Sequence, residues 1–397
     1  MTPFLQFLIA ITIIVLAAKL GGYLSLKLGQ PSVLGELAVG IILGPSILDI
    51  FNWTPFTDKH LGEAIAHIAE LGVLLLMFIA GLELHLSDLA KSGKVSAFAG
   101  ILGVLLPLGM GYGLARAFGF DDQTAIFTGI ILAATSVSIS AQTLMEMKVL
   151  RSRVGIGLLG AAVFDDILVI LSLSIFVALA VGSGGLWSIV WIVVRMLLYI
   201  GIAIVVGLAL LPRLSQKVFK LPISQGLIAF ILVVTFFYAW TAEVLGGMAA
   251  ITGAFLAGLI FARSPVKERI EKGISTLAYS FFVPIFFVNV GLAANARLLT
   301  GDNLWLLLAM IAVAVVSKIL GSGLGARLAG FTNLESLQIG AGMTSRGEVG
   351  LIVASVGIAE GMISPSVFAV IVGVVIVTTL LTPAMLRVLF TKNTLTT

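Results

Sequence analysis

Long apolar runs separated by short polar segments recur from one end of the chain to the other. Each run is about 18–25 residues long, enough for a helix to cross the hydrocarbon core of a bilayer. The pattern predicts about thirteen membrane-spanning segments, at residues 3–26, 31–49, 61–84, 95–118, 123–146, 152–181, 186–214, 223–242, 247–263, 274–293, 303–328, 334–359 and 364–390. No polar stretch is long enough to form a separate soluble domain. We therefore expect one all-α integral membrane unit.

The composition excludes a soluble protein. Charged residues make up 11% of the chain and hydrophobic residues 59%, whereas a soluble domain carries about 25% charged residues. The chain has no cysteine, which excludes disulfides, thiol catalysis and cysteine-based metal sites. The apolar run that follows Met1 lacks a basic leader, so we interpret it as the first span and not as a signal peptide.

The basic residues are distributed unevenly between the two sides of the predicted membrane. Of the 23 lysines and arginines, sixteen fall in loops on one side and only Lys59, Arg116 and Arg297 on the other. Loops rich in Lys and Arg face the cytoplasm. The pattern therefore predicts an N-terminus outside and a cytoplasmic C-terminus. It also accounts for the net charge of +4 without a nucleic-acid partner.

An odd number of spans suggests two six-helix units of opposite topology joined by one connecting span. Inverted repeats of this kind recur in secondary transporters, where discontinuous helices meet near the membrane midplane. The fifth and twelfth spans then correspond, and both contain small and hydroxyl residues, at 133–140 and 340–350. We expect both helices to be broken there and to cross. The alternative is that the glycines only allow close helix packing.

Two adjacent acids, Asp165 and Asp166, lie near the middle of the sixth span. A charge at mid-bilayer costs about 2.5–3.5 kcal/mol on insertion scales, so such residues are usually functional. Neighbours on a helix point about 100° apart, so one acid can face a cavity while the other faces a partner helix. Carboxylate oxygens also suit hard cations. The pair is therefore a candidate cation and proton site, and the alternative is an acid pair that only cross-links helices.

Three further charges inside predicted spans stand out. Lys318 is too far from either end of the eleventh span to snorkel easily, so it needs an acidic partner or loses its proton. Asp165 is the candidate partner, and the sequence does not distinguish a structural salt bridge from one that opens during transport. Arg346 and Glu348 fall in the suspected break of the twelfth span. Their charges can neutralise each other or the exposed ends of half-helices, which predicts a structural or electrostatic role.

These features together resemble the monovalent cation–proton antiporter superfamily, in particular its sodium/proton and Kef-like members. The resemblance covers nearly the whole chain. It rests on QPSVLGE at 30–36, LGP at 43–45, AELGV at 69–73, GLE at 81–83, ATSV at 134–137, the Asp165–Asp166 pair, GAFLAG at 253–258, PIFF at 284–287 and RGEVG at 346–350. Each motif is weak alone, but their order and their places on the spans make the set specific.

The resemblance implies a homodimer with a dimerisation domain at residues 1–94 and 223–302, a linker helix within 182–222, and a core ion-translocation domain at 95–181 and 303–397. It implies that Asp166 is the main cation and proton carrier, and that Asp165 pairs with Lys318 and releases it when sodium binds. Thr135 and Ser136 would lie near the crossing of the broken helices. Members with two acids here are generally electrogenic.

The sequence thus predicts a sodium/proton antiporter of a bacterial inner membrane, with no cofactor besides the transported sodium, potassium or lithium and protons. Potassium/proton exchange on the same scaffold remains the alternative, and an ion channel is a further one. An intramembrane enzyme is not expected, because no other catalytic motif accompanies the acids. Many Kef-like relatives add regulatory nucleotide-binding domains; the chain ends soon after Arg387, so we expect such control only from a separate subunit.

Overall fold

The computed structural model describes residues 1–28, 30–83, 92–180, 186–292, 297, 301–347, 350, 353–354, 357 and 362–391, and these residues form helices and connecting turns without a strand. The helices are α1 (Pro3–Lys27), α2 (Ser32–Leu43), η1 (Ile50–Asn52), α3 (Leu61–Glu83), α5 (Gly93–Ala117), α6 (Asp122–Ala133), α7 (Val137–Glu146), α8 (Arg153–Ala180), α9 (Leu186–Phe219), α10 (Gly226–Thr241), η2 (Ala242–Gly246), α11 (Ala250–Phe261), α12 (Lys267–Leu277), η3 (Ala278–Phe282), α13 (Val283–Leu292), α14 (Gly301–Leu328), α15 (Asn333–Gly342) and α17 (Pro365–Thr391).

The predicted spans are confirmed. Within the described ranges, ten helical stretches are long and apolar enough to cross a membrane, with α6 and α7 counted as one and the short apolar helices α2 and α11 in addition. With α15, these elements occupy all thirteen predicted segments. The protein is therefore an all-helical integral membrane protein.

Two boundaries differ from the prediction by six residues or more. The second span ends at Leu43 instead of residue 49, because Gly44 is extended and precedes Pro45, a position that disfavours helix. The tenth begins at Lys267 instead of residue 274, since the polar helix α12 precedes the apolar run and continues into it through the π-helical turn η3.

The helix packing follows the two-unit plan. The short helices α2 and α11 are 12 residues each and occupy the second and ninth spans. Helix α2 packs against α13, the tenth span, while α11 packs against α3, the third. The second span of each half therefore contacts the third span of the other half. Helices α5 and α14, the fourth and eleventh spans, pack directly against each other.

Glycines make these reciprocal contacts possible. A methyl group added to Gly258 of α11 would lie 2.0 Å from the Phe78 carbonyl oxygen of α3, and one added to Gly40 of α2 would lie 2.2 Å from the Val288 carbonyl oxygen of α13. Only glycine lets the two backbones approach so closely, which is the usual means of helix association in membranes.

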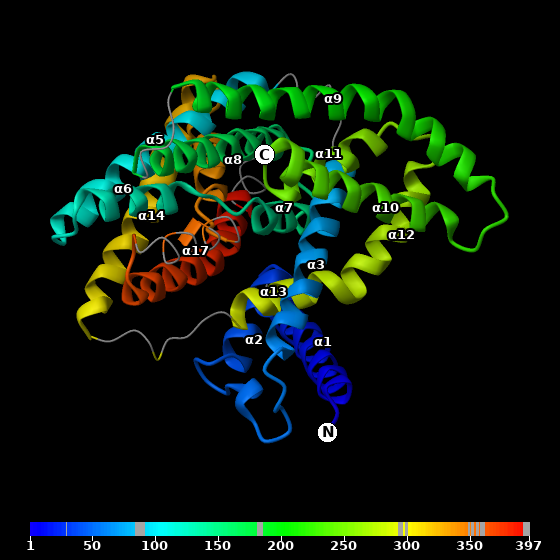
Figure 1. Cartoon of the computed structure of the whole chain (residues 1–397), viewed down its shortest axis with the longest axis horizontal. Helices are drawn as coiled ribbons and strands as arrows, with labels where there is room; N and C mark the ends of the chain where they lie inside the picture. The colour runs from blue at the N-terminus through cyan, green and yellow to red at the C-terminus, as the bar shows by residue number, and fades with distance from the viewer. Residues whose placement is uncertain are drawn as a thin grey trace.

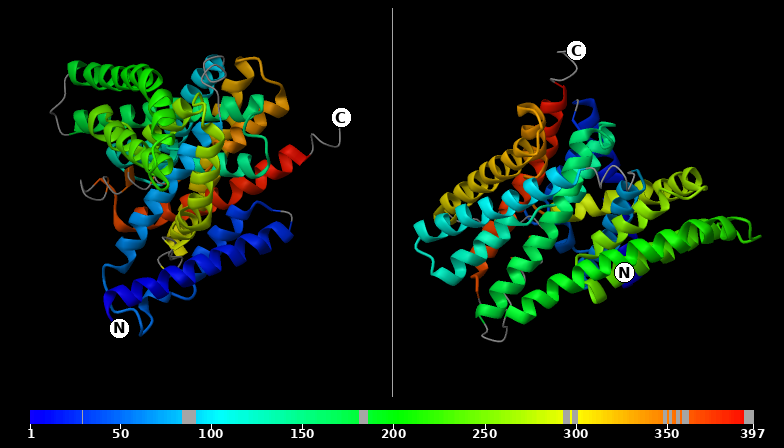
Figure 2. Two further views of the ribbon diagram at one scale, coloured as in Figure 1. Left: turned by 90° about the vertical axis from the view of Figure 1, so that its right-hand side faces the viewer. Right: turned by 90° about the horizontal axis from the view of Figure 1, so that it is seen from above.

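The helices form two groups. Helices α5 to α8 pack with α14, α15 and α17, and α1 to α3 pack with α10 to α13; the groups occupy opposite sides in Figure 1. The long helix α9 runs along one edge of the molecule in Figures 1 and 2. Asp165 and Asp166 of α8 lie within the first group. Helix α7, which also belongs to the first group, contacts α2 and α3 of the second.

Candidate functional site

The fifth span is broken between α6 and α7. Ala134 and Ser136 adopt extended backbone angles, with ψ of 137° and 109°, and the hydroxyl and β-branched residues of this stretch have weak helix propensity. In the twelfth span α15 ends at Gly342, and residues 344–347 are not helical. Both predicted breaks are therefore present.

The two breaks cross at a pair of serines. The backbone nitrogen of Ser136 donates to the Ser345 carbonyl at 2.8 Å, and the Ser345 hydroxyl donates to the Ser136 carbonyl at 2.7 Å. The Ser140 hydroxyl donates to the Gly342 carbonyl at 2.5 Å. These bonds supply partners for backbone groups that lose their helical bonds inside the membrane, as such breaks require. The predicted crossing of two discontinuous helices is confirmed.

Asp165 faces α14. The Lys318 ammonium donates a hydrogen bond to Asp165 Oδ1, and both side chains are fully buried. Asp165 Oδ2 has no hydrogen-bond partner among the described residues, although the Thr135 side chain lies beside this carboxyl. Pairing compensates much of the cost of burying each charge, and removing one partner would leave the other uncompensated.

Asp166 faces in a different direction. It lines a small cavity together with Val137, Leu159 and Val163 of its own helix group and Met77, Ile251, Thr252 and Phe255 of α3 and α11. The side chain is 4% exposed. The two acids thus have different surroundings: Asp165 is in an ion pair inside one helix group, whereas Asp166 lies where that group meets the other.

Arg346 lies at the second break and is 1% exposed. Its guanidinium donates to the Met343 carbonyl at 3.2 Å and to the Ala314 carbonyl of α14 at 3.0 Å. Met343 follows the last residue of α15, so the positive charge lies at the negative end of this half-helix dipole. Its expected partner Glu348 lies outside the described residues.

Several polar residues that contact the breaks were not singled out from the sequence. The Thr378 hydroxyl accepts from the backbone nitrogen of Arg346 at 3.2 Å, the Thr379 hydroxyl donates to the Arg346 carbonyl at 2.6 Å, and the hydroxyls of Thr344 and Thr382 lie 2.8 Å apart. The available signal was the run of threonines at 378, 379 and 382 in the otherwise apolar helix α17. Thr252 in α11 was missed because a single threonine carries no such signal.

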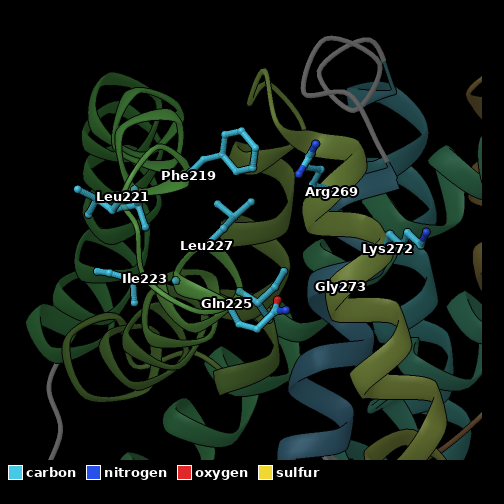
Figure 3. Close-up of a pocket in the computed structure, with 11 residues that line it drawn as sticks. Phe219, Leu221, Ile223, Gln225, Leu227, Arg269, Lys272 and Gly273 are labelled. Carbon is cyan, nitrogen blue, oxygen red and sulfur yellow. The ribbon is translucent and has the colours of Figure 1, made fainter.

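A second pocket among the described residues is formed by other helices than those that carry the acids. This larger pocket lies between the end of α9, the start of α10 and α12, where Phe219, Gln225, Arg269 and Lys272 line it (Figure 3). The Arg269 guanidinium lies 4.6 Å from the centre of the Phe219 ring. None of the candidate ion-site residues lines this pocket, so its size does not make it the ion site.

Comparisons with known proteins agree with this geometry. The model of the transmembrane sodium/hydrogen exchanger family matches residues 12–392. The chain is 38% identical to the Na(+)/H(+)-K(+) antiporter GerN of Bacillus cereus, over 97% of this chain and 96% of that one. It is 34% identical to a Na(+)/H(+) antiporter of Enterococcus hirae, over 98% and 99% of the two chains.

A solved structure has the same fold. The sodium proton antiporter MjNhaP1 of Methanocaldococcus jannaschii superposes with a TM-score of 0.72 at 18% identity, over 98% of this chain and 99% of that one. At this identity the match speaks for the fold alone. The sequence matches over nearly the whole length decide the family: the chain belongs to the sodium/hydrogen exchanger family.

Proposed function

We propose that this chain, as a member of the sodium/hydrogen exchanger family, exchanges sodium ions for protons across a membrane and that Asp166 carries both. The observation that carries the proposal is that the two acids have different surroundings. Asp165 is held by Lys318, while Asp166 lines a cavity beside the crossing of two broken helices. The names of the relatives, which are antiporters of sodium and protons, support the same activity.

The proposed cycle follows from competition at one site. A carboxylate binds either a proton or a cation. The core therefore changes the side to which Asp166 is open only when Asp166 carries one of the two. Thr135 and Ser136, in the break between α6 and α7, provide oxygen atoms near the acids, and oxygen is the ligand that hard cations prefer. When sodium binds, Asp165 releases Lys318 and adds a second negative charge to the site. Arg346 stays in place and stabilises the ends of the half-helices.

The movement we propose is that of one helix group against the other. The core comprises residues 95–181 and 303–397, the dimerisation domain comprises 1–94 and 223–302, and α9, within 182–222, links them. Two copies of the chain associate through the dimerisation domain, so the core moves against a fixed scaffold. The pattern of basic loops favours an external N-terminus and a cytoplasmic C-terminus. The relatives from Bacillus cereus and Enterococcus hirae support a bacterial cell membrane as the location.

The test is proton flux in sealed proteoliposomes that contain a pH-sensitive dye. Sodium added outside vesicles with the wild type should drive protons out, so that the internal pH rises. Asp166→Asn should abolish this signal while the protein stays folded. Asp122→Asn is the matched control, because Asp122 is an exposed acid paired with Arg116 and should keep the wild-type rate. Sodium-driven exchange that survives in Asp166→Asn would rule out Asp166 as the carrier.

The same vesicles test whether transport is electrogenic. If Lys318 also loses its proton when Asp165 releases it, two protons exchange for one sodium ion; each cycle then moves one net charge, and a membrane potential contributes about 2.3 kcal/mol per 100 mV. We expect a sodium jump to give a transient current on a solid-supported membrane. A flux without current would assign an electroneutral exchange.

Potassium is the second candidate ion, because the relative GerN is named a Na(+)/H(+)-K(+) antiporter. Replacing sodium with potassium or lithium in the flux experiment decides between the ions. A signal with potassium alone would make this chain a potassium/proton antiporter on the same scaffold, and an unsaturable flux would indicate a channel.

A further inference from the structure

The cavity at Asp166 has polar groups on both of its sides. Eight of the described residues line it, and six of them are apolar: Met77, Val137, Leu159, Val163, Ile251 and Phe255. The other two are Asp166 on α8 and Thr252 on α11. Helices α8 and α11 belong to different helix groups. Each helix group therefore contributes one oxygen-bearing side chain to the same small pocket.

Thr252 lies in the first turn of α11, where the helix has no carbonyl four residues back for its hydroxyl. Buried threonines of this chain usually donate to the carbonyl four residues earlier in their own helix, as Thr235 does to Ile231 and Thr143 does to Ile139, both at 2.8 Å. Helix α11 begins at Ala250 after an extended Ala249. The usual acceptor, the carbonyl of residue 248, therefore precedes the helix, and the Ala249 carbonyl already accepts the backbone nitrogen of Thr252 at 3.0 Å. The residue is nonetheless 3% exposed.

A monovalent cation that leaves water needs several oxygen atoms in place of its hydration shell. Asp166 supplies two at most, and the apolar walls of the cavity supply none. We propose that Thr252 donates a hydroxyl oxygen to the cation held by Asp166, so that the ion is bound between α8 and α11. Thr252 is then a residue that determines cation affinity and selectivity. This inference rests on the proposed function of Asp166.

The position of Thr252 has a consequence for the two sides of the membrane. Asp166 moves with the core, whereas Thr252 stays with the scaffold. Asp166 and Thr252 can both contact the ion only in the conformation in which they line the same pocket. Loss of the hydroxyl should therefore weaken sodium binding from one side of the membrane more than from the other. A threonine that served packing alone would not produce such an asymmetry.

Thr252→Val tests the proposal, because valine keeps the shape and removes the oxygen. In proteoliposomes of known orientation, we expect its KM for sodium to rise about tenfold on one side, the effect of losing roughly one favourable polar contact. The maximal rate should change little. Thr252→Ser retains the hydroxyl and should stay within about twofold of the wild type. The ratio of sodium to potassium or lithium transport should change in Thr252→Val alone.

Thr235→Val is the matched control, since Thr235 is a buried scaffold threonine that bonds its own helix; its KM should equal that of the wild type. Protection of the purified protein from thermal unfolding by sodium gives a second readout, and it should weaken in Thr252→Val only. Wild-type KM, selectivity and sodium protection in Thr252→Val would overturn this inference. Absence of exchange in the wild type, or exchange in Asp166→Asn, would instead refute the proposed function.

Discussion

The carboxylate of Glu146, the last residue of α7, accepts hydrogen bonds from both the backbone nitrogen of Ser32, at 2.7 Å, and the Ser32 hydroxyl. Ser32 is the first residue of α2, so the acid lies at the positive end of that helix dipole. The Gln142 amide donates to the same carboxylate at 2.8 Å and orients it. Because α7 and α2 belong to different helix groups, this contact joins the groups at one end of the molecule.

If the core moves against the scaffold, this contact must open during each cycle. We expect a short cross-link between Ser32→Cys and Glu146→Cys to stop sodium/proton exchange and its chemical reduction to restore it. The chain has no cysteine of its own, so thiol cross-linkers of graded length would react at the two introduced sites alone.

The reduced double variant and the two single variants are the controls for the loss of the hydrogen bonds between Glu146 and Ser32. Flux and the fraction cross-linked are measured on the same sample. Exchange at the rate of the reduced protein in a fully cross-linked sample would show that α2 and α7 do not separate during transport.

The pair of Lys318 and Asp165 should behave as a buried ion pair. We expect Lys318→Met to destabilise the protein by about 3–5 kcal/mol, because it leaves the Asp165 carboxylate buried without its partner. The double variant Lys318→Met with Asp165→Asn removes both charges and should recover much of that loss. Thermal unfolding in detergent measures both.

The exposed pair of Arg116 and Asp122, 3.2 Å apart, is the comparison for this cycle. Breaking it should cost about 0–1 kcal/mol, as for other surface ion pairs. Equal effects at the two pairs would contradict the buried geometry of Lys318 and Asp165.

The close approach of α11 and α3 predicts a strong effect of a single methyl group. In Gly258→Ala the new Cβ would lie 2.0 Å from the Phe78 carbonyl oxygen, so the helices must separate. We expect a loss of stability of about 1–3 kcal/mol, the usual cost of overpacking, seen as a lower unfolding temperature. At Gly113 of α5 nothing lies within 4 Å of an added Cβ, so Gly113→Ala should leave the unfolding temperature close to the wild-type value.

Much of the architecture could be predicted from local sequence. Helix positions follow from the length of the apolar runs, and the breaks at residues 134–136 and 343–347 follow from small and hydroxyl residues that favour helix weakly. The acids and Lys318 stand out because charges in apolar spans are costly. The boundaries that were wrong, near residues 43 and 267, depend on a proline turn and on a polar helix that a search for apolar runs overlooks.

The tertiary structure alone decided how these parts meet. Sequence shows that Asp165 and Asp166 point apart, but the rotation of α8 against α14 and α11 determines which acid faces Lys318 and which faces the cavity. The bonds between Ser136 and Ser345 and between Glu146 and Ser32 join residues more than a hundred positions apart. Thr252 resembles any other threonine in the sequence, and only the packing of α11 places it in the pocket that Asp166 lines. Such relationships depend on packing between helices that are distant in sequence. The residue pattern within one helix does not specify which helices pack against it.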